Sequence, residues 1–348
     1  MASHSVTHGG QALAFAREHN LDYRNVLDFS ANINPLGPSV RALEAIRQRL
    51  DVLQVYPDQT SVSLIRCLSE RLQLSPENIL AGNGATELLY FWLRTVRPRR
   101  AALVIPTFTE YRRALESVGA EIQTIPLRPE DDFRLPPTPV DTDVVILTNP
   151  NNPTGSYAPP EEMFEWIGRF PSSTHIFVDE AFVEFTAQPS LVRYIGRFPN
   201  LWILRSMTKF YAIPGLRLGY LAGAGVGTLV EYREPWQVNS LAELAGIASL
   251  EDRGYEEATL QLVQRERIWI WKQLRNIPFI RAFQTHANFF FARCDSDDRF
   301  DRLIALLLER NTLIRDCRSV EGLEGPYFRF AIKTRADNTH LLAYLRNI

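Results

Sequence analysis

The chain has 348 residues, of which 45% are hydrophobic and 22% are charged, and its formal net charge is -2. These proportions are those of an ordinary globular protein. The small net charge argues against nucleic acid or a membrane surface as the main partner. No stretch reaches the roughly 20 apolar residues of a membrane span, and residues 1–20 lack the apolar run of a signal peptide. We therefore expect a cytoplasmic protein.

Three cysteines, Cys67, Cys294 and Cys317, lie far apart in the sequence. Their number is odd and their spacing matches no metal motif. We therefore expect reduced thiols, as in a cytoplasmic protein, and no metal site.

The N-terminal part begins with polar residues and continues into two predicted helices, at residues 11–18 and from Ser39 to about residue 50. His8 and Gly9 precede the first helix, where a frayed terminus is the ordinary interpretation. Residues 27–37 (LDFSANINPLG) follow as an extended segment that contains Asn32 and ends in turn residues.

Residues 82–87 (GNGATE) place glycines before an apolar helix predicted at residues 88–96. Backbone N–H groups at such a helix start can approach an anion closely, and the helix dipole adds to the attraction. The segment lacks the lysine of a P-loop, so an ordinary helix cap is the alternative.

Short apolar runs then alternate with helical segments. The runs that read as buried strands are residues 101–105, 121–127, 144–147, 175–178, 201–204 and 218–222. The alternation predicts a mostly parallel sheet with helices on both faces, and ligands of such a sheet bind beyond the carboxyl ends of its strands. Phe108, Asn152, Asp179 and Lys209 all follow predicted strands.

Lys209 is the residue best suited to covalent chemistry. It follows an apolar strand, in a turn that is rich in hydroxyl groups and lacks acidic residues. Positive charge from Arg205 and Arg217 should lower its pKa, because like charges disfavour the ammonium form. An amine that is neutral near pH 7 can condense with a carbonyl group. Ser206 and Arg217 would then suit a phosphate group.

From about residue 236 the pattern changes to longer helices combined with a few strands, which predicts a separate α+β domain. Arg315 and Arg329 lie within apolar strands, where a charge is costly unless it meets an anion. The bidentate geometry of arginine suits carboxylate or phosphate. From the residues alone, a structural ion pair is an equally good explanation.

Four segments resemble, in the same order, those of pyridoxal-phosphate enzymes of the aspartate-aminotransferase fold (fold type I). They are residues 82–87, 149–155 (NPNNPTG), 178–182 (VDEAF), and Ser206-x-x-Lys209 followed eight residues later by Arg217. The resemblance implies a large α/β domain with a mostly parallel sheet at residues 49–235. It also implies a smaller α+β domain built from residues 1–48 and 236–348, and a homodimer with shared active sites.

The same resemblance implies the cofactor pyridoxal 5'-phosphate (PLP) and a role for each candidate residue. Lys209 would bind the cofactor aldehyde, Asp179 the ring nitrogen and Asn152 the ring oxygen. Phe108 would stack on the ring. The cofactor phosphate would be held by Ala85, Thr86, Ser206 and Arg217, and by Tyr56 reaching across the dimer interface, although a tyrosine in an ordinary turn is the alternative there.

Within this fold, residues 27–37 are most similar to the threonine-phosphate decarboxylases of cobalamin synthesis, and histidinol-phosphate aminotransferases are more distantly similar. The similarity implies a small phosphorylated amino acid as substrate, held by His8, Gly9, Asn32, Asn152, Arg315 and Arg329. The expected reaction releases CO2 from L-threonine O-3-phosphate and gives (R)-1-amino-2-propanol O-2-phosphate. An aminotransferase is the alternative, but Phe182 stands where those enzymes usually carry a tyrosine.

Overall fold

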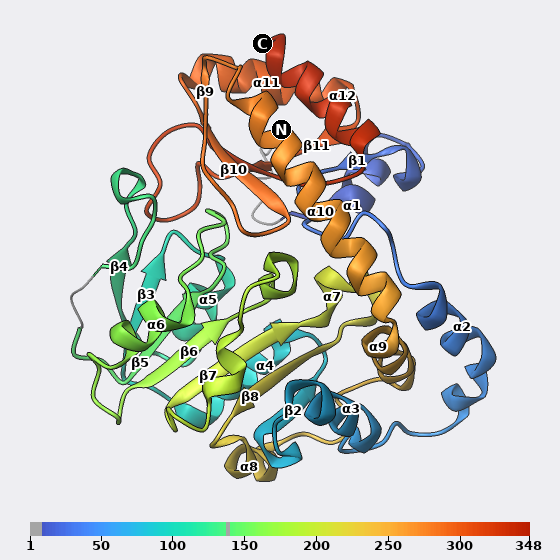
Figure 1. Cartoon of the computed structure of the whole chain (residues 1–348), viewed down its shortest axis with the longest axis vertical. Helices are drawn as coiled ribbons and strands as arrows, with labels where there is room; N and C mark the ends of the chain where they lie inside the picture. Colours follow the sequence, from blue (N-terminus) through green and yellow to red (C-terminus); the bar gives the residue numbers. More distant parts are fainter. Residues whose placement is uncertain (1–8, 137–139) are drawn as a thin grey trace.

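The computed structural model describes residues 9–136 and 140–348, so His8 lies outside the described residues. Its largest sheet has seven strands in the order β2-β8-β7-β6-β5-β3-β4 (Figure 1). Neighbouring strands run parallel from β4 to β7, whereas β8 runs antiparallel to both β7 and β2. The predicted, mostly parallel sheet is therefore confirmed. Its strands are β2 (Ile79–Gly82), β3 (Arg100–Ile105), β4 (Glu121–Pro126), β5 (Val144–Thr148), β6 (His175–Asp179), β7 (Leu201–Ser206) and β8 (Gly219–Gly223).

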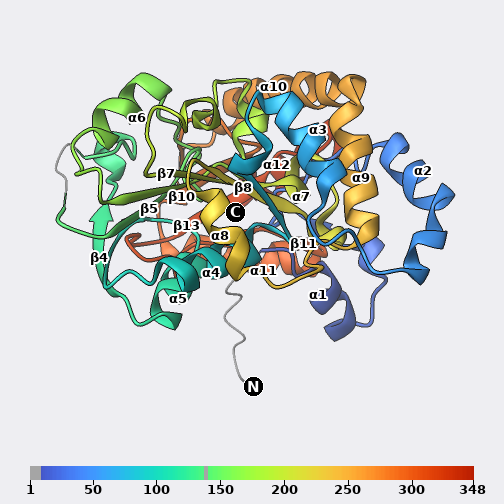
Figure 2. The same cartoon turned by 90° about the horizontal axis from the view of Figure 1, so that it is seen from below.

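Helices cover both faces of this sheet because successive side chains of its buried strands point to opposite sides. Leu103 packs in one hydrophobic cluster with Trp92 of α4, and its neighbour Val104 packs in another with Met163 of α6. In Figure 2, α4 and α5 accordingly lie on one face and α6 on the other. These helices are α4 (Ala85–Val96), α5 (Glu110–Ser117) and α6 (Pro160–Ile167), and two single turns, α7 (Met207–Phe210) and α8 (Val226–Leu229), flank β8.

A smaller antiparallel sheet has four strands in the order β12-β13-β10-β9. The N-terminal part pairs with the C-terminal part in a separate sheet of two parallel strands, β1 and β11. The strands are β1 (Leu27–Asp28), β9 (Ile280–Ala282), β10 (Phe289–Cys294), β11 (Thr312–Leu313), β12 (Arg315–Asp316) and β13 (Tyr327–Ala331). The remaining helices are α1 (Ala12–Glu18), α2 (Val40–Gln48), α3 (Val62–Leu72), α9 (Ser240–Glu251), α10 (Arg253–Leu274), α11 (Asp297–Glu309) and α12 (Arg335–Arg346).

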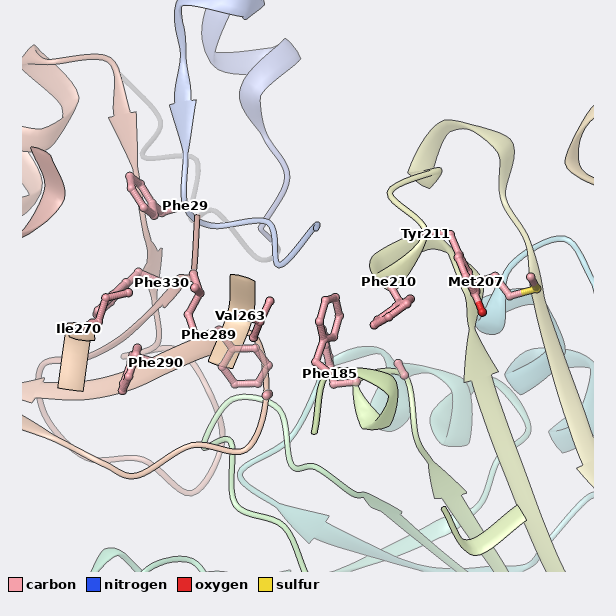
Figure 3. Packing of buried hydrophobic residues seen from close by; sticks show 14 of the residues in the cluster. Phe29, Phe185, Met207, Phe210, Tyr211, Val263, Ile270, Phe289, Phe290 and Phe330 are labelled. Carbon is pink, nitrogen blue, oxygen red and sulfur yellow. The ribbon is translucent and has the colours of Figure 1, made fainter. Parts of the chain in front are cut away.

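One hydrophobic cluster connects the two sheets (Figure 3). Phe289 and Phe330 of the small sheet pack, with Val263 of α10, into the same cluster as Phe185 and Phe210 beside the large sheet. Burial of these aromatic side chains stabilises the packing of the two parts against each other. The segment that carries Lys209 is thus held between them. The domain limits at residues 49 and 236 remain a proposal, since α9 packs against both α2 and α3.

Candidate active site

A cavity of about 620 Å³ opens at the carboxyl ends of the large sheet's strands, facing the small sheet. Side chains from three separate parts of the chain line it, as expected for a ligand site in an open α/β sheet. The predicted residues that line it are Gly9, Asn32, Ala85, Thr86, Phe108, Asn152, Asp179, Ser206, Lys209, Arg217, Arg315 and Arg329.

Lys209 lies in α7, directly after β7, and its Nζ donates a hydrogen bond to Thr208 Oγ1 over 2.9 Å. Burial lowers the pKa of Lys209 to about 8, with a further lowering by Arg217 and an opposing effect of Asp179. A lowered pKa is what the neighbouring positive charge predicted, but burial lowers it more than the charge of Arg217 does.

The predicted position of Arg205 beside this lysine is wrong. Its guanidinium bonds to Glu180 over 3.0 Å and to Glu184 over 2.6 Å. Successive side chains of a strand point to opposite faces, so Arg205 faces away from the side to which Ser206 points.

Asp179 ends β6 and is held by two donors. Its Oδ1 accepts the backbone N–H of Ala181 over 2.6 Å, and its Oδ2 accepts the hydroxyl of Tyr111. Burial raises the pKa of Asp179, and these hydrogen bonds and Lys209 oppose the rise. Tyr111 is not among the residues predicted for the site. Tyr111 follows Phe108 by three residues at the start of a helix. This spacing could have indicated from the sequence that the side chains of Phe108 and Tyr111 lie on one helix face.

The start of α4 suits a phosphate group. The helix begins at Ala85 rather than at the predicted residue 88, so the N–H groups of Ala85 and Thr86 have no acceptor within it. Gly84 has φ +86°, and a Cβ there would lie 2.9 Å from Arg217 Nη2. A glycine at this position therefore lets the guanidinium come close to the helix start.

Arg315 and Arg329 lie directly opposite each other on β12 and β13, and both are buried. Arg329 donates to Asn152 Oδ1 and, over 2.8 Å, to the carbonyl oxygen of Ser30. Its Nε has no partner among the described residues. Burial lowers the pKa of Arg329 to about 10, and the adjacent Arg315 contributes. Two neighbouring buried cations of this kind favour an anionic ligand.

The N-terminal segment closes one side of the cavity. Gly10 donates its N–H to Ser30 Oγ over 2.9 Å, and Asp28 holds Ser30 in turn through a 2.5 Å hydrogen bond. A Cβ on Gly9 would lie 2.1 Å from the carbonyl oxygen of Ser30, so this close approach requires glycine. The buried Asn32 Oδ1 has no partner within the described part of the chain.

Two aromatic residues differ in their relation to the cavity. Phe182 lines it and packs edge-on against Phe289, with ring centroids 5.1 Å apart. Tyr56 lies outside the cavity of its own chain, is 78% exposed, and stacks on Trp236 with ring centroids 4.7 Å apart. The structure therefore does not bring Tyr56 together with the other predicted cofactor residues.

Neither a metal site nor a membrane-spanning helix is found within residues 9–136 and 140–348. No group of three or more His, Cys, Asp and Glu side chains there is arranged to hold a metal ion. No described helix combines the length and apolar character needed to cross a membrane.

A half-buried lysine opposite a carboxylate, beside a helix start suited to phosphate, defines a carbonyl-binding enzyme site on an α/β fold. Residues 24–345 match the family Aminotransferase class I and II, and the chain belongs to this family. Membership of the family implies the cofactor PLP.

The similar proteins include threonine-phosphate decarboxylases and histidinol-phosphate aminotransferases. The chain is 38% identical to the threonine-phosphate decarboxylase of Salmonella typhimurium, over 100% of this chain and 98% of that protein. The solved histidinol-phosphate aminotransferase of Clostridium acetobutylicum superposes with a TM-score of 0.86 at 32% identity, covering 92% of this chain and 98% of that one. The L-threonine-O-3-phosphate decarboxylase of Porphyromonas gingivalis gives 0.81 at 25% identity, covering 92% and 99%. The backbone fold is thus shared by both groups.

Proposed function

We propose that the protein decarboxylates L-threonine O-3-phosphate to (R)-1-amino-2-propanol O-2-phosphate and CO2, using PLP, as a step in making the aminopropanol side chain of cobalamin. The observation that carries this proposal is the buried pair Arg315 and Arg329 at the cavity wall. Two adjacent cations match a substrate that carries both a phosphate and a carboxylate. The 38% identity to a threonine-phosphate decarboxylase supports the same choice.

The residues present fit the proposed cofactor. Lys209 would hold its aldehyde, Asp179 its ring nitrogen and Phe108 the face of its ring, while Asn152 would donate to the ring oxygen. Because Arg329 occupies Asn152 Oδ1, the Nδ2 of Asn152 remains as the donor. The phosphate would lie against Ala85, Thr86, Ser206 and Arg217. When bound, PLP supplies an aldehyde for the substrate amine and a ring that accepts electrons from a bond broken at Cα.

Substrate position decides which bond at Cα breaks. Arg315 and Arg329 would bind the phosphate and the carboxylate, with Asn32, Gly9 and His8 completing the contacts from the N-terminal segment. Fixing both anionic groups fixes the rotation about the Cα bonds, so the carboxylate can be held out of the plane of the ring. That orientation favours loss of CO2 over loss of a proton. By orienting the substrate, Arg315 and Arg329 would thus select decarboxylation.

Histidinol-phosphate aminotransferase is the alternative, because a solved member is 32% identical and its fold is closely similar. Phe182 argues against it. A tyrosine there would give the ring oxygen a second donor, whereas Phe182 packs its ring against Phe289 and offers none.

The deciding assay supplies carboxyl-labelled phosphothreonine without any keto acid and measures labelled CO2. A decarboxylase needs no amino acceptor, so we expect release to continue through many turnovers, with little release from unphosphorylated threonine. Label that stays in solution, together with glutamate formed from histidinol phosphate and 2-oxoglutarate, would establish the aminotransferase instead.

We further propose a homodimer with shared active sites. Tyr56 stacks on the exposed Trp236, and the apolar residues that precede and follow Tyr56 in the chain are also exposed: Val40, Leu50, Leu53, Val55 and Val62. Exposed large apolar side chains in such number are typical of a protein interface. A second copy covering these side chains would place Tyr56 where it can reach the neighbouring cofactor phosphate.

The compartment we propose is the cytoplasm. Cys67, Cys294 and Cys317 are all free thiols, and two of them are buried. Free thiols are kept reduced in that compartment. Oxidant titration of the folded protein, with mass spectrometry for disulfides, tests whether the three thiols stay free.

A further inference from the structure

Tyr111 is a buried residue of the cavity wall with no role in the function proposed above. It lies in the first turn of α5, is only 1% exposed, and its hydroxyl donates to Asp179 Oδ2. Burial is the largest cause that raises the pKa of this phenol well above its usual range, followed by the charge of Asp179. Tyr111 therefore remains a neutral hydrogen-bond donor.

Asp179 needs hydrogen-bond donors to stay ionised, because burial destabilises its carboxylate. Its other oxygen accepts the N–H of Ala181 over 2.6 Å, and the cationic groups that act on it are Lys209 of α7 and Arg205 of β7. A hydrogen bond to a carboxylate stabilises the ionised form. Tyr111, which lies in α5, thus fixes the direction of the Asp179 carboxylate and makes this carboxylate a weaker base.

We propose that Tyr111 is a positioning residue that keeps Asp179 ionised and directed into the cavity, so that the proton shared with the bound cofactor stays on the ring nitrogen. The inference rests on the proposed role of Asp179. Without the tyrosine donor, a buried Asp179 is a stronger base and draws that proton to itself. The ring then becomes neutral and accepts electrons less well.

The test uses the holoenzyme loaded with PLP that carries ¹⁵N at the ring nitrogen. Wild-type protein should give a pyridinium signal, and Tyr111→Phe should shift the signal toward neutral pyridine. Tyr111→His, which keeps a donor, should retain more of the pyridinium signal than Tyr111→Phe. Tyr90→Phe is the matched control, because Tyr90 donates to Glu110 and lies outside the cavity. If Tyr111→Phe fails to fold, Tyr111→Met removes the donor in its place.

A second readout separates this role from a merely structural one. 1-Deazapyridoxal phosphate has carbon in place of the ring nitrogen, so it cannot share the proton. We expect Tyr111→Phe to weaken binding of PLP about tenfold to a hundredfold, as for loss of a charged hydrogen bond, and to leave binding of the analogue within about twofold. Equal losses for both compounds, or an unchanged ¹⁵N signal, overturn the inference. If Asp179→Asn also leaves the ¹⁵N signal unchanged, it is the proposed role of Asp179 that fails.

Discussion

Lys209 shows at the scale of one residue how burial prepares an amine for reaction. A lysine in water has a pKa of about 10.4, so its amine is almost wholly protonated at neutral pH. The pKa of Lys209 is lowered to about 8, first by burial and then by Arg217. The neutral, nucleophilic form is therefore accessible near physiological pH.

The rate at which the apoprotein captures pyridoxal, measured without phosphate, should reflect this shift. Because the neutral amine reacts, we expect the rate to rise about tenfold per pH unit below the pKa and to level off above pH 8. Arg217→Met should move the midpoint upward, since it removes a positive neighbour. Borohydride reduction and peptide mapping provide the measurement. The chain has only two other lysines, Lys272 and Lys333, so a label on either, or a midpoint near 10, contradicts the assignment.

Arg315 gives the cleanest test of substrate binding. Arg329 also holds Asn152, so its removal would disturb a residue proposed to contact the cofactor. We expect Arg315→Ala to cost about 2–5 kcal/mol in phosphothreonine binding, as for a buried charge deprived of its partner, and to lower kcat/KM accordingly. The visible spectrum of bound PLP should not change. The control is Arg318→Ala, which removes a partly exposed arginine paired with Asp301 and Asp316; an equal loss there would refute the role of Arg315.

At the scale of elements, a buried ion pair joins the ends of the two strands that carry the site. Arg205 on β7 bonds to Glu180, which follows β6 and is fully buried, and Ser190 donates to the same carboxylate. Glu180 is the neighbour of Asp179, and Arg205 is the neighbour of Ser206. The pair therefore fixes the spacing of the two strand ends across which Lys209 and Asp179 face each other.

Arg205→Met should destabilise the apoprotein by about 3–5 kcal/mol, because it leaves Glu180 buried and charged without its partner. Urea denaturation measures the loss. Arg94→Met is the matched control, since its pair with Glu234 is exposed on both sides and should contribute about 0–1 kcal/mol. Similar losses in the two variants would show that the buried pair has no special part in joining the strands.

The sequence predicted those elements and residues whose signal is local. Apolar runs located the buried strands, and glycine before a helix located the start of α4, although the helix begins three residues earlier than its apolar pattern. The partners of Arg205 and Asp179 were not predictable in the same way. Strand alternation sets the side to which Arg205 points, but the pairing of β6 with β7 brings Glu180 to it, and Tyr111 meets Asp179 only because the start of α5 lies beside the end of β6. Such partners depend on tertiary packing, which no local pattern encodes.

At the scale of the whole molecule, the proposed homodimer would complete each site with Tyr56 of the second chain. Tyr56 stacks on Trp236 at the surface and does not line the cavity that contains Lys209. If two copies share their sites, each cavity takes Lys209 from one chain and Tyr56 from the other. Activity then depends on which chains are paired, and mixing two inactive variants tests this directly.

Lys209→Ala should be inactive, and Tyr56→Ala should lose most of its affinity for PLP because a hydrogen bond to the phosphate is removed. In a hybrid dimer, one site would carry both substitutions and the other would be intact. Mixing the two variants under conditions that exchange subunits should therefore restore decarboxylation, up to one working site per hybrid. Leu53→Asp, which places a charge among the exposed apolar side chains, should prevent both the dimer and the recovery, as seen by light scattering and the CO2 assay. Recovery that never exceeds the sum of the separate variants would mean that Tyr56 acts, if at all, within its own chain.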